Sequence, residues 1–499
     1  PLRLRPASEF SPGDHGAVGP ALGLFATAQP AFSPAWREAV ARVPAATQAC
    51  REVAAFLEGA YACKQTGEAV VVGWVVHAPG TSVWLEDEDG TIHPFDDGVY
   101  RRFRQDVLDA VGHDFGQIEN RDAGFVARTP GLKPGGRIRL KALSAAGVHT
   151  VSETTAGNLP TEPVAAARSL FSMFVPIADF HQRITRIDEQ VIGPILRHSQ
   201  DRWPELTVKV RRLGTAPAAP RTSVIVPLYG RADFVEHQLI ELAGDEVFRR
   251  DAELIYVIDD PKLVEPFAAQ AEALHRLYRV PFTWVWGSAN RGFSGANNLG
   301  VAQARGEHLI FLNSDAFPQR AGWAGALVEV LREHPSVGAV GPRLTFAEGG
   351  IQHAGMAFMR REELGIWVNH HPRMGMDPAL DPARGLTVVP AITGACLAMR
   401  RSDFDAVGGW DTGYLIGDFE DSDLCLKLRA RGLQCAYLPE VQLTHLERQS
   451  FKLLGQDEFR TRVVIYNAVR HQNRWGALIE ASERLAEAGT APVADARRD

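Results

Sequence analysis

From residue 221 onward the chain alternates short apolar, β-prone runs with longer helical stretches, and this alternation restricts its fold more than any other feature. The strand-like runs are TSVIVPL, ELIYVI, FTWVW and HLIFL, and the helical stretches are DFVEHQLIEL, PFAAQAEALHRLY and GANNLGVAQA. Strands that alternate with helices form a mostly parallel sheet with helices on both faces. The pattern therefore predicts an α/β, Rossmann-like domain with a mostly parallel sheet.

Acidic residues follow the ends of these strands. Asp259-Asp260 closes one strand, and the triplet Asn313-Ser314-Asp315 closes another. In open α/β sheets, ligands bind beyond the carboxyl ends of the strands. A carboxylate at Asp259 could accept a hydrogen bond from the ring N–H of uracil, thymine or guanine, although a capping role is an equal alternative. Oxygen ligands two residues apart at Asn313 and Asp315 suit a hard cation such as Mg²⁺ or Mn²⁺.

A third acidic group, at Glu420-Asp421, precedes the amphipathic stretch LCLKLRARG. Acidic residues in the first turn of a helix are stabilised by the helix dipole, so capping alone is one interpretation. Four acids within six residues exceed what capping needs, and a carboxylate here would suit a general base for a hydroxyl group.

Charge, apolar runs and cysteine content argue against several classes of protein. The net charge of −7 over 499 residues gives no support for nucleic-acid binding, whose footprint is basic. No apolar stretch reaches the roughly 18 residues of a membrane span, and the first residues contain no apolar signal-peptide core. Five cysteines without a CxxC pair suit a reducing cytoplasm. We expect a cytoplasmic protein.

Changes in residue composition and hydrophobic pattern along the chain predict five regions. Residues 1–62 are expected to be an extension and a helix, with a helical pattern from about Pro34 to Cys63, and residues 63–155 a small β-sandwich-like domain. Residues 156–220 are expected to be a helical linker, 221–450 the α/β domain, and 451–499 C-terminal helices and a tail. A spacer role for the β-domain is favoured over glycan or partner binding, although Trp74 and Trp84 could stack on sugars.

Together, five segments resemble glycosyltransferase family 2, the inverting enzymes with the GT-A fold. They are VPLYGR, YVIDD, NRGFSGANNLGVAQARGEHLIFLNSD, ITGACLAMRRSDFDAVGGWDTGYLIGDFEDSDLCLKLRARG and LTHLERQS, in this order. The resemblance covers about residues 221–450. It implies an enzyme that moves a sugar from a nucleotide-diphosphate sugar to a hydroxyl of a glycan or a lipid-linked glycan, with help from Mg²⁺ or Mn²⁺. Bacterial members of this kind often build O-antigen or other surface polysaccharides.

The resemblance also implies a role for each matching position. Asp421 would be the catalytic base, with Glu420 orienting it, Asp315 and His445 would ligate the metal, and Trp410 and Asp411 would shape the acceptor site. The donor nucleotide sugar would be bound by Pro227, Tyr229, Asp259, Asp260, Asn290, Gly292, Asn297 and Asn313.

The chain departs from the family pattern at two places. The triplet begins with Asn313 in place of an aspartate, so its first position offers a neutral ligand, and the Asp-Asp strand end is followed by Pro261-Lys262. The pair His370-His371 is interpreted as part of a loop near the acceptor cleft in preference to a second metal site.

Two other functions stay open from the sequence. A catalytically silent sugar-nucleotide or glycan-binding protein would need a damaged site, and a nucleotidyltransferase would need a glycine-rich phosphate loop after the first strand.

The C-terminal helical stretch is expected to pack on the catalytic domain. The alternative is contact with the inner face of a membrane that carries a lipid-linked acceptor. The oligomeric state is not predicted.

Overall fold

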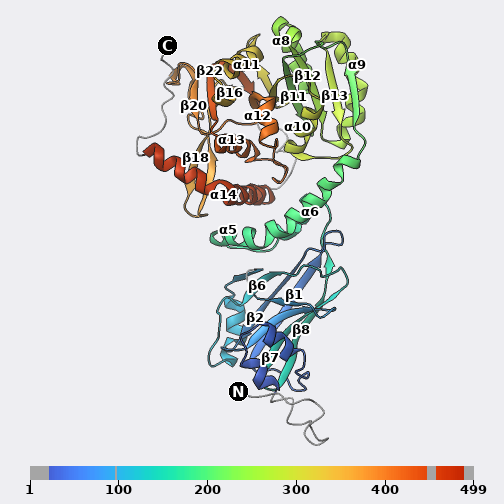
Figure 1. Ribbon diagram of the computed structural model, residues 1–499, viewed down its shortest axis with the longest axis vertical. Helices are drawn as coiled ribbons and strands as arrows, with labels where there is room; N and C mark the ends of the chain where they lie inside the picture. Colours follow the sequence, from blue (N-terminus) through green and yellow to red (C-terminus); the bar gives the residue numbers. More distant parts are fainter. Residues whose placement is uncertain (1–21, 96–97, 447–456, 488–499) are drawn as a thin grey trace, which may run out of the picture. The chain divides into compact units, whose positions relative to one another are not determined.

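The computed structural model describes residues 22–95, 98–446 and 457–487. The chain divides into two compact units, Pro1–Ser199 and Gln200–Asp499 (Figure 1). The prediction of a tail at the C-terminus falls outside the described residues, as does most of the expected N-terminal extension.

The first unit is built from two sheets around one apolar core; their strands pair antiparallel, except that β9 runs parallel to β1. One sheet has the order β5-β6-β2-β1-β9 and the other the order β4-β3-β7-β8. Valine, leucine and phenylalanine side chains from both sheets fill the space between them. The strands are β1 (Val53–Ala62), β2 (Ala69–His77), β3 (Ser82–Asp87), β4 (Ile92–Pro94), β5 (Val99–Arg102), β6 (Gly124–Arg128), β7 (Arg137–Ser144), β8 (Gly147–Thr155) and β9 (Gly157–Asn158).

The predicted helix from Pro34 to Cys63 is wrong in its second half. The helix α2 ends at Val40, and β1 pairs with β2 in antiparallel register. The segment VAAFLEGAYA contains four alanines, a leucine and a glutamate, which favour a helix when they are considered alone. Pairing with β2 and burial of alternate side chains override this local preference. The sandwich therefore begins earlier than predicted.

The two tryptophans singled out in the sequence have different environments. Trp84 is fully buried and meets the ring of Trp36 edge-on, at 5.2 Å between centroids. It is a core residue and is not available to stack on a sugar. Trp74 is half-buried beside α3 (Gln105–Val111).

Helices follow the sandwich, within the helical linker that the sequence predicted for residues 156–220. They are α4 (Pro163–Phe171), α5 (Phe180–Arg183), a π-helical turn (Ile184–Asp188) and α6 (Glu189–Asp201).

The second unit is centred on one mixed sheet with the order β10-β13-β12-β11-β14-β21-β16-β22-β15. Its β13, β12, β11 and β14 are mutually parallel neighbours. The strands are β10 (Lys209–Leu213), β11 (Thr222–Leu228), β12 (Ala252–Ile258), β13 (Phe282–Trp286), β14 (His308–Leu312), β15 (Ala316–Pro318), β16 (Val337–Thr345), β17 (Ile351–His353), β20 (Thr387–Val389), β21 (Cys396–Arg400) and β22 (Gln434–His445), and a separate hairpin is formed by β18 (Ala357–Arg361) and β19 (Ile366–His370). Because β10 pairs with β13, the sheet includes residues that the sequence assigned to the linker.

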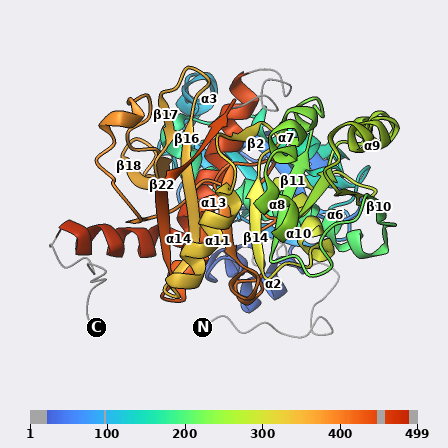
Figure 2. The same ribbon diagram turned by 90° about the horizontal axis from the view of Figure 1, so that it is seen from above.

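Helices cover both faces of this sheet (Figures 1 and 2). One apolar core joins the sheet to α7 (Phe234–Ala243), α8 (Glu246–Asp251), α9 (Val264–Tyr278) and α11 (Trp323–Glu333). The other core joins it to α10 (Gly292–Gln303), α12 (Arg401–Ala406) and α13 (Glu420–Ala430). The predicted α/β fold class is confirmed by this arrangement. The sheet as a whole is mixed: β13, β12, β11 and β14 are parallel neighbours, whereas β21 pairs antiparallel with both β14 and β16.

The last element is the long helix α14 (Asp457–Glu487), in the segment where a helix was predicted. Its side chains Val463, Tyr466 and Val469 are buried within the second unit. Among the described residues, no helix has the length and apolar character to cross a membrane.

The contact between α10 and the sheet depends on Gly300. A Cβ atom added there would lie 2.4 Å from a methyl group of Ile225 and 3.0 Å from one of Val257. We predict that Gly300→Ala destabilises the second unit by about 1–3 kcal/mol, because the extra methyl forces the helix away from the sheet. Urea denaturation measures this.

Gly325 in α11 provides the matched control. An added Cβ there meets Val247 at 3.6 Å, an ordinary contact. Gly325→Ala is expected to be neutral or stabilising by up to about 1 kcal/mol, from helix propensity. Equal effects of the two substitutions would show that the close approach at Gly300 has no energetic weight.

Candidate active site

Asp259 lies at the end of β12, where the sequence placed a base-binding carboxylate. Its Oδ1 accepts a hydrogen bond of 2.7 Å from the backbone N–H of Arg291, at the start of α10. Burial raises the pKa of Asp259 to about 8, although the amides of Arg291 and Gly292 act in the opposite direction. The carboxyl group therefore connects the strand end to the beginning of the glycine- and asparagine-rich helix.

The neighbouring predicted donor residues occupy the same edge, in different environments. Asp260 accepts from the N–H of Lys262 at 2.9 Å and caps the short turn Pro261–Leu263, which accounts for the departure from the family sequence there. Pro227 and Tyr229 are half-buried at the end of β11. Burial, reinforced by the charges of Asp260 and Asp259, raises the pKa of Tyr229.

The residues of the NRGFSGANNLG block divide into exposed and buried ones. Asn290 is exposed and accepts from the N–H of Gly292 at 2.9 Å, and Gly292 has a left-handed φ of 66°. Asn297 is fully buried; its amide donates to the carbonyl of Phe293 at 3.0 Å, and its Oδ1 has no hydrogen-bond partner. Asn290 and Gly292 are thus placed to meet a ligand directly, whereas Asn297 lies inside the helix packing.

Asp315 and His445 come together at the edge of the sheet. Oδ1 of Asp315 lies 3.2 Å from Nε2 of His445, and both side chains are buried. Nδ1 of His445 lies 2.6 Å from Oε1 of Gln352, a contact in which the histidine donates its N–H, and the Gln352 amide donates to the backbone carbonyl of His445 at 3.3 Å. Asn313 contributes its Nδ2, 3.3 Å from Nε2 of the same histidine.

This donor set fits a divalent cation. With its proton held at Nδ1 by Gln352, His445 presents the Nε2 lone pair toward Asp315. A ligating histidine commonly has such an outer partner. Within the described ranges, no group of three or more His, Cys, Asp or Glu side chains has metal-binding geometry. Among the described residues, this point of the sheet edge therefore carries two ionisable side chains, Asp315 and His445.

The Glu420-Asp421 pair begins α13. The Asp421 carboxylate accepts two backbone hydrogen bonds, from Gly394 to Oδ2 at 3.0 Å and from Ser422 to Oδ1 at 2.7 Å. Glu420 is buried, and its Oε2 has no hydrogen-bond partner. Burial, together with the charges of Asp421 and Asp418, raises the pKa of Glu420 well above its usual range.

One short segment connects the sheet edge that carries Asn313, Asp315 and His445 to the Glu420-Asp421 pair. The N–H of Gly394 donates to Asp421, and the carbonyl of Ala395 accepts from the N–H of Asn313 at 2.9 Å. Consecutive residues therefore hold the Asn313 backbone and the Asp421 carboxylate, which brings together groups more than a hundred residues apart in the sequence.

The turn before α13 has an unusual backbone. Ile416, Asp418 and Phe419 have φ values of 65°, 77° and 74°, in the left-handed region that favours glycine. Such conformations persist only where the surroundings impose them, and they concentrate at functional sites. The ring of Phe419 lies against His471 of α14, and Ser422 Oγ is 3.1 Å from Nε2 of the same histidine.

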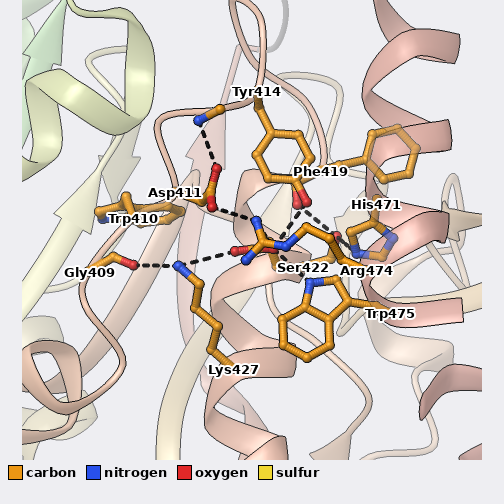
Figure 3. Close-up of polar contacts among 12 residues, drawn as sticks. Gly409, Trp410, Asp411, Tyr414, Phe419, Ser422, Lys427, His471, Arg474 and Trp475 are labelled. Atoms are coloured by element: carbon orange, nitrogen blue, oxygen red, sulfur yellow. Dashed lines mark hydrogen bonds and ion pairs between the residues drawn. The ribbon is translucent and has the colours of Figure 1, made fainter. Parts of the chain in front are cut away.

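Asp423 forms the centre of a polar cluster behind this turn. Its fully buried carboxylate accepts from Tyr414 at 3.1 Å and from the indole of Trp475 at 2.7 Å, and it pairs with Arg474 at 3.0 Å and Lys427 at 3.3 Å. Figure 3 shows the rings of Tyr414 and Trp475 and the guanidinium group of Arg474 converging there. This acid has a structural role, and it explains why the acidic group exceeds what capping needs.

The residues expected to shape the acceptor site lie beside this cluster. Trp410 is 2% exposed, and its ring meets Phe293 and Phe311 edge-on, at 5.3 and 5.0 Å between centroids. Asp411 pairs with Arg470 of α14 and, as Figure 3 shows, with Arg474 of the same helix. In this structure the ring of Trp410 has no open face for a sugar. Trp410 and Asp411 therefore support the loop 410–419 from within.

The two histidines of the His370-His371 pair have separate environments. Nδ1 of His371 lies 3.1 Å from Nδ1 of His353, a buried residue next to Gln352 that the sequence had not singled out. His370 is the last residue of β19.

Comparison with known proteins agrees with this geometry. Residues 223–408 match the sequence profile described as Glycosyl transferase family 2. They form a glycosyl transferase family 2 domain. The resemblance inferred from the five motifs is thereby confirmed, and α13, His445 and α14 lie beyond the matched segment.

Several curated proteins match part of this chain. The O-antigen biosynthesis protein RfbC of Myxococcus xanthus is 30% identical over 46% of this chain, and an N-acetylglucosaminyl-diphospho-decaprenol L-rhamnosyltransferase of Mycobacterium tuberculosis is 26% identical over 38% of it and 67% of its own length. The uncharacterised protein y4gI of Sinorhizobium fredii is 30% identical over 52% of the chain. The chain spans only 18% of the length of RfbC and 27% of y4gI.

His471 gives the site a testable pH dependence. Burial and the neighbouring Arg474 charge lower its pKa to about 3. Between pH 3 and 6.5 the unfolded chain binds a proton that the folded chain rejects, so this residue's stabilisation is complete above pH 6.5 and is lost as the pH falls. When the pH falls from 6.5 to 5, the free energy of unfolding should decrease for both proteins. We predict that the decrease is about 2 kcal/mol smaller for His471→Gln than for the wild type, because this histidine contributes about 1.4 kcal/mol per pH unit.

Urea unfolding followed by tryptophan fluorescence at the two pH values measures this difference. The exposed His237 in α7 supplies the control, because His237→Gln should keep the pH dependence of the wild type. The same dependence in the His471 variant would contradict the assignment.

Proposed function

We propose that this chain is an inverting glycosyltransferase that moves a sugar from a nucleotide-diphosphate sugar to a hydroxyl of a glycan or lipid-linked glycan. The observation that carries the proposal is the Gly394-Ala395 segment, which binds the Asp421 carboxylate on one side and the Asn313 backbone on the other. A base and a cation-binding edge are thereby adjacent, as transfer from an activated sugar requires.

Asp421 is the proposed base. Each of its oxygens accepts one backbone N–H, which fixes the plane of the carboxylate, while an ionised carboxylate offers about four lone-pair sites. A remaining lone pair takes the proton of the acceptor hydroxyl as that oxygen attacks the anomeric carbon. The bond to the diphosphate breaks with its electrons on the phosphate oxygen, so the configuration inverts.

Glu420 is proposed to remain a neutral acid beside this base. Its raised pKa favours the protonated form, which can donate a hydrogen bond to a nearby carboxylate or to the acceptor. One negative charge in the pair, in place of two, keeps Asp421 free to accept the proton.

Asp315 and His445 are the proposed protein ligands of Mg²⁺ or Mn²⁺. When bound, the cation supplies positive charge that neutralises the departing diphosphate. Asn313 lies against the Nε2 edge of His445 and adds a neutral polar group. At the other end of the site, Asp259, Asn290 and Gly292 are proposed to bind the nucleotide.

The relatives suggest the biological setting. One is named for O-antigen biosynthesis and another for rhamnosyl transfer to a diphospho-decaprenol-linked sugar. We propose a bacterial polysaccharide pathway and an acceptor of this lipid-linked class. A cytoplasmic location, with contact to the inner face of the membrane, belongs to the same proposal.

Asp421→Asn tests the base. We predict that the transfer rate falls by a factor of at least about 100, the scale of general-base catalysis, while the affinity for the nucleotide diphosphate stays the same. Exposed Asp405→Asn on the neighbouring α12 is the matched control and should retain full activity. Full activity of the Asp421 variant would remove the assignment.

Product analysis with a set of sugar nucleotides separates the classes of function. Released nucleoside diphosphate indicates glycosyl transfer, and released pyrophosphate indicates nucleotidyl transfer. Binding of a donor without turnover, with an acceptor present, would favour a silent binding protein.

Gln352→Leu tests the cation site. It leaves the proton of His445 free to move to Nε2, so we predict that the concentration of Mn²⁺ needed for half-maximal activity rises about 10- to 100-fold. Calorimetry with Mn²⁺ and a nucleotide diphosphate gives a second readout. Gln319→Leu serves as control because its amide contacts Thr444 and Thr345 on the same edge without touching His445. Turnover unaffected by EDTA would show that Asp315 and His445 have another role.

A further inference from the structure

The loop from Trp410 to Phe419 leads directly into Glu420 and Asp421, and side-chain amides hold its backbone. The first belongs to Asn298 in α10. Its Nδ2 donates to the carbonyl of Trp410 at 3.0 Å, and its Oδ1 accepts from the N–H of the same residue at 3.1 Å. One amide therefore satisfies both backbone groups of the residue where the loop begins.

Gln200, at the end of α6, holds the next point of the loop. Its Nε2 donates to the carbonyl of Thr412 at 2.7 Å, and its Oε1 accepts from the Thr412 hydroxyl at 3.0 Å. Gln200 lies before the segment matched to the family, and it belongs to the same compact unit as the loop.

Asn467 of α14 holds the part of the loop nearest to Asp421. Its Oδ1 accepts from the N–H of Leu415 at 3.0 Å, and its Nδ2 donates to the carbonyls of Leu415 at 2.9 Å and Gly417 at 2.7 Å. The residue is fully buried. These bonds enclose the left-handed residue Ile416 on both sides.

We infer that Asn298, Gln200 and Asn467 together hold the loop 410–419 in a preformed shape and act as positioning residues for Asp421. Three non-glycine residues of the loop have left-handed φ angles, which an unrestrained chain disfavours. Asn298 and Asn467 each bind both the N–H and the carbonyl of one loop residue, and Gln200 binds the carbonyl and the hydroxyl of Thr412. A change of conformation at any of these loop residues would therefore break hydrogen bonds to the amide that holds it. The expected effects on sugar transfer rest on the proposed function, whereas the preformed shape of the loop does not.

The three amides come from separate parts of the second unit. Asn298 lies in the helix whose start binds Asp259, so donor-side and acceptor-side segments share one contact. A Cβ added at Gly292 would lie 3.9 Å from the carbonyl of Ile416, which places the start of that helix beside the loop. The amides therefore fix the acceptor loop relative to the donor edge.

Asn467→Asp is the principal test, since it keeps the size of the side chain and removes both donated bonds. Exposed Asn473→Asp on the same helix makes the same chemical change and is the control. We expect transfer by the Asn467 variant to fall at least tenfold, with less than a twofold change in nucleotide diphosphate affinity. In an Asp421→Asn background the same substitution should reduce the residual rate less than twofold, because both changes act through one group.

Loss of donor affinity in parallel with the rate, or a further tenfold loss in the Asp421→Asn background, would indicate general destabilisation and overturn the inference. Because a charge at buried Asn467 could prevent folding, Gln200→Glu provides a second variant at a half-buried position. It is expected to lower the transfer rate at least threefold, again without changing donor affinity. An unchanged rate in this variant would remove Gln200 from the set.

Hydrogen exchange tests positioning without any substrate. The N–H of Gly394 is bonded to the Asp421 carboxylate, so it reports where that side chain lies. In the Asn467 or Gln200 variant we expect the amides of Leu415 and Gly394 to exchange at least tenfold faster, with the amides of β11 unaffected. Unchanged exchange at Gly394 would overturn the inference. Absence of transfer by the wild type would instead contradict the proposed function and leave this measurement valid.

Discussion

The buried carboxylate of Asp423 is the interaction on which the acceptor half of the second unit depends. An ionised group without solvent is tolerated only when it is fully paired. Its partners come from three places: Tyr414 from the loop, Lys427 from α13 and Arg474 with Trp475 from α14. Because these partners all bind one carboxylate, the loop and the two helices are fixed together. The position of Asp421, two residues earlier, follows from that arrangement.

The sequence predicted those parts of the fold and the site that a local pattern encodes. Alternating strand and helix patterns predicted the α/β sheet. They also placed Asp259 and Asp315 after strand ends, where the structure has them, because parallel strands deliver their last residues to one edge. His445 needed the family resemblance, since a single histidine has no pattern of its own. β1 was misread as helix because alanine-rich composition suits both states until a partner strand is present.

Residues that act through one tertiary contact could not be predicted. Gln352, Gln200 and Asn467 are isolated polar residues, and only the fold shows that each faces a backbone group or a histidine. Asn297 and Asn298 also show that the sequence alone does not reveal which way a side chain faces. Asn297 was expected to line the donor pocket and is buried, whereas Asn298 holds the acceptor loop. One residue along a helix turns a side chain by about 100°, and the sequence did not indicate which of the two would meet the loop.

The placement of α14 has a consequence for the evolution and engineering of such enzymes. The family profile ends at residue 408, yet the acceptor loop is held by Asn467, Arg470 and Arg474, which follow about fifty residues later or more. On the proposed function, substitutions in α14, which lies outside the segment matched to the family, could change the choice of acceptor. A chimera joined at the profile boundary would therefore separate Asp421, the proposed base, from the α14 side chains that hold the loop before it.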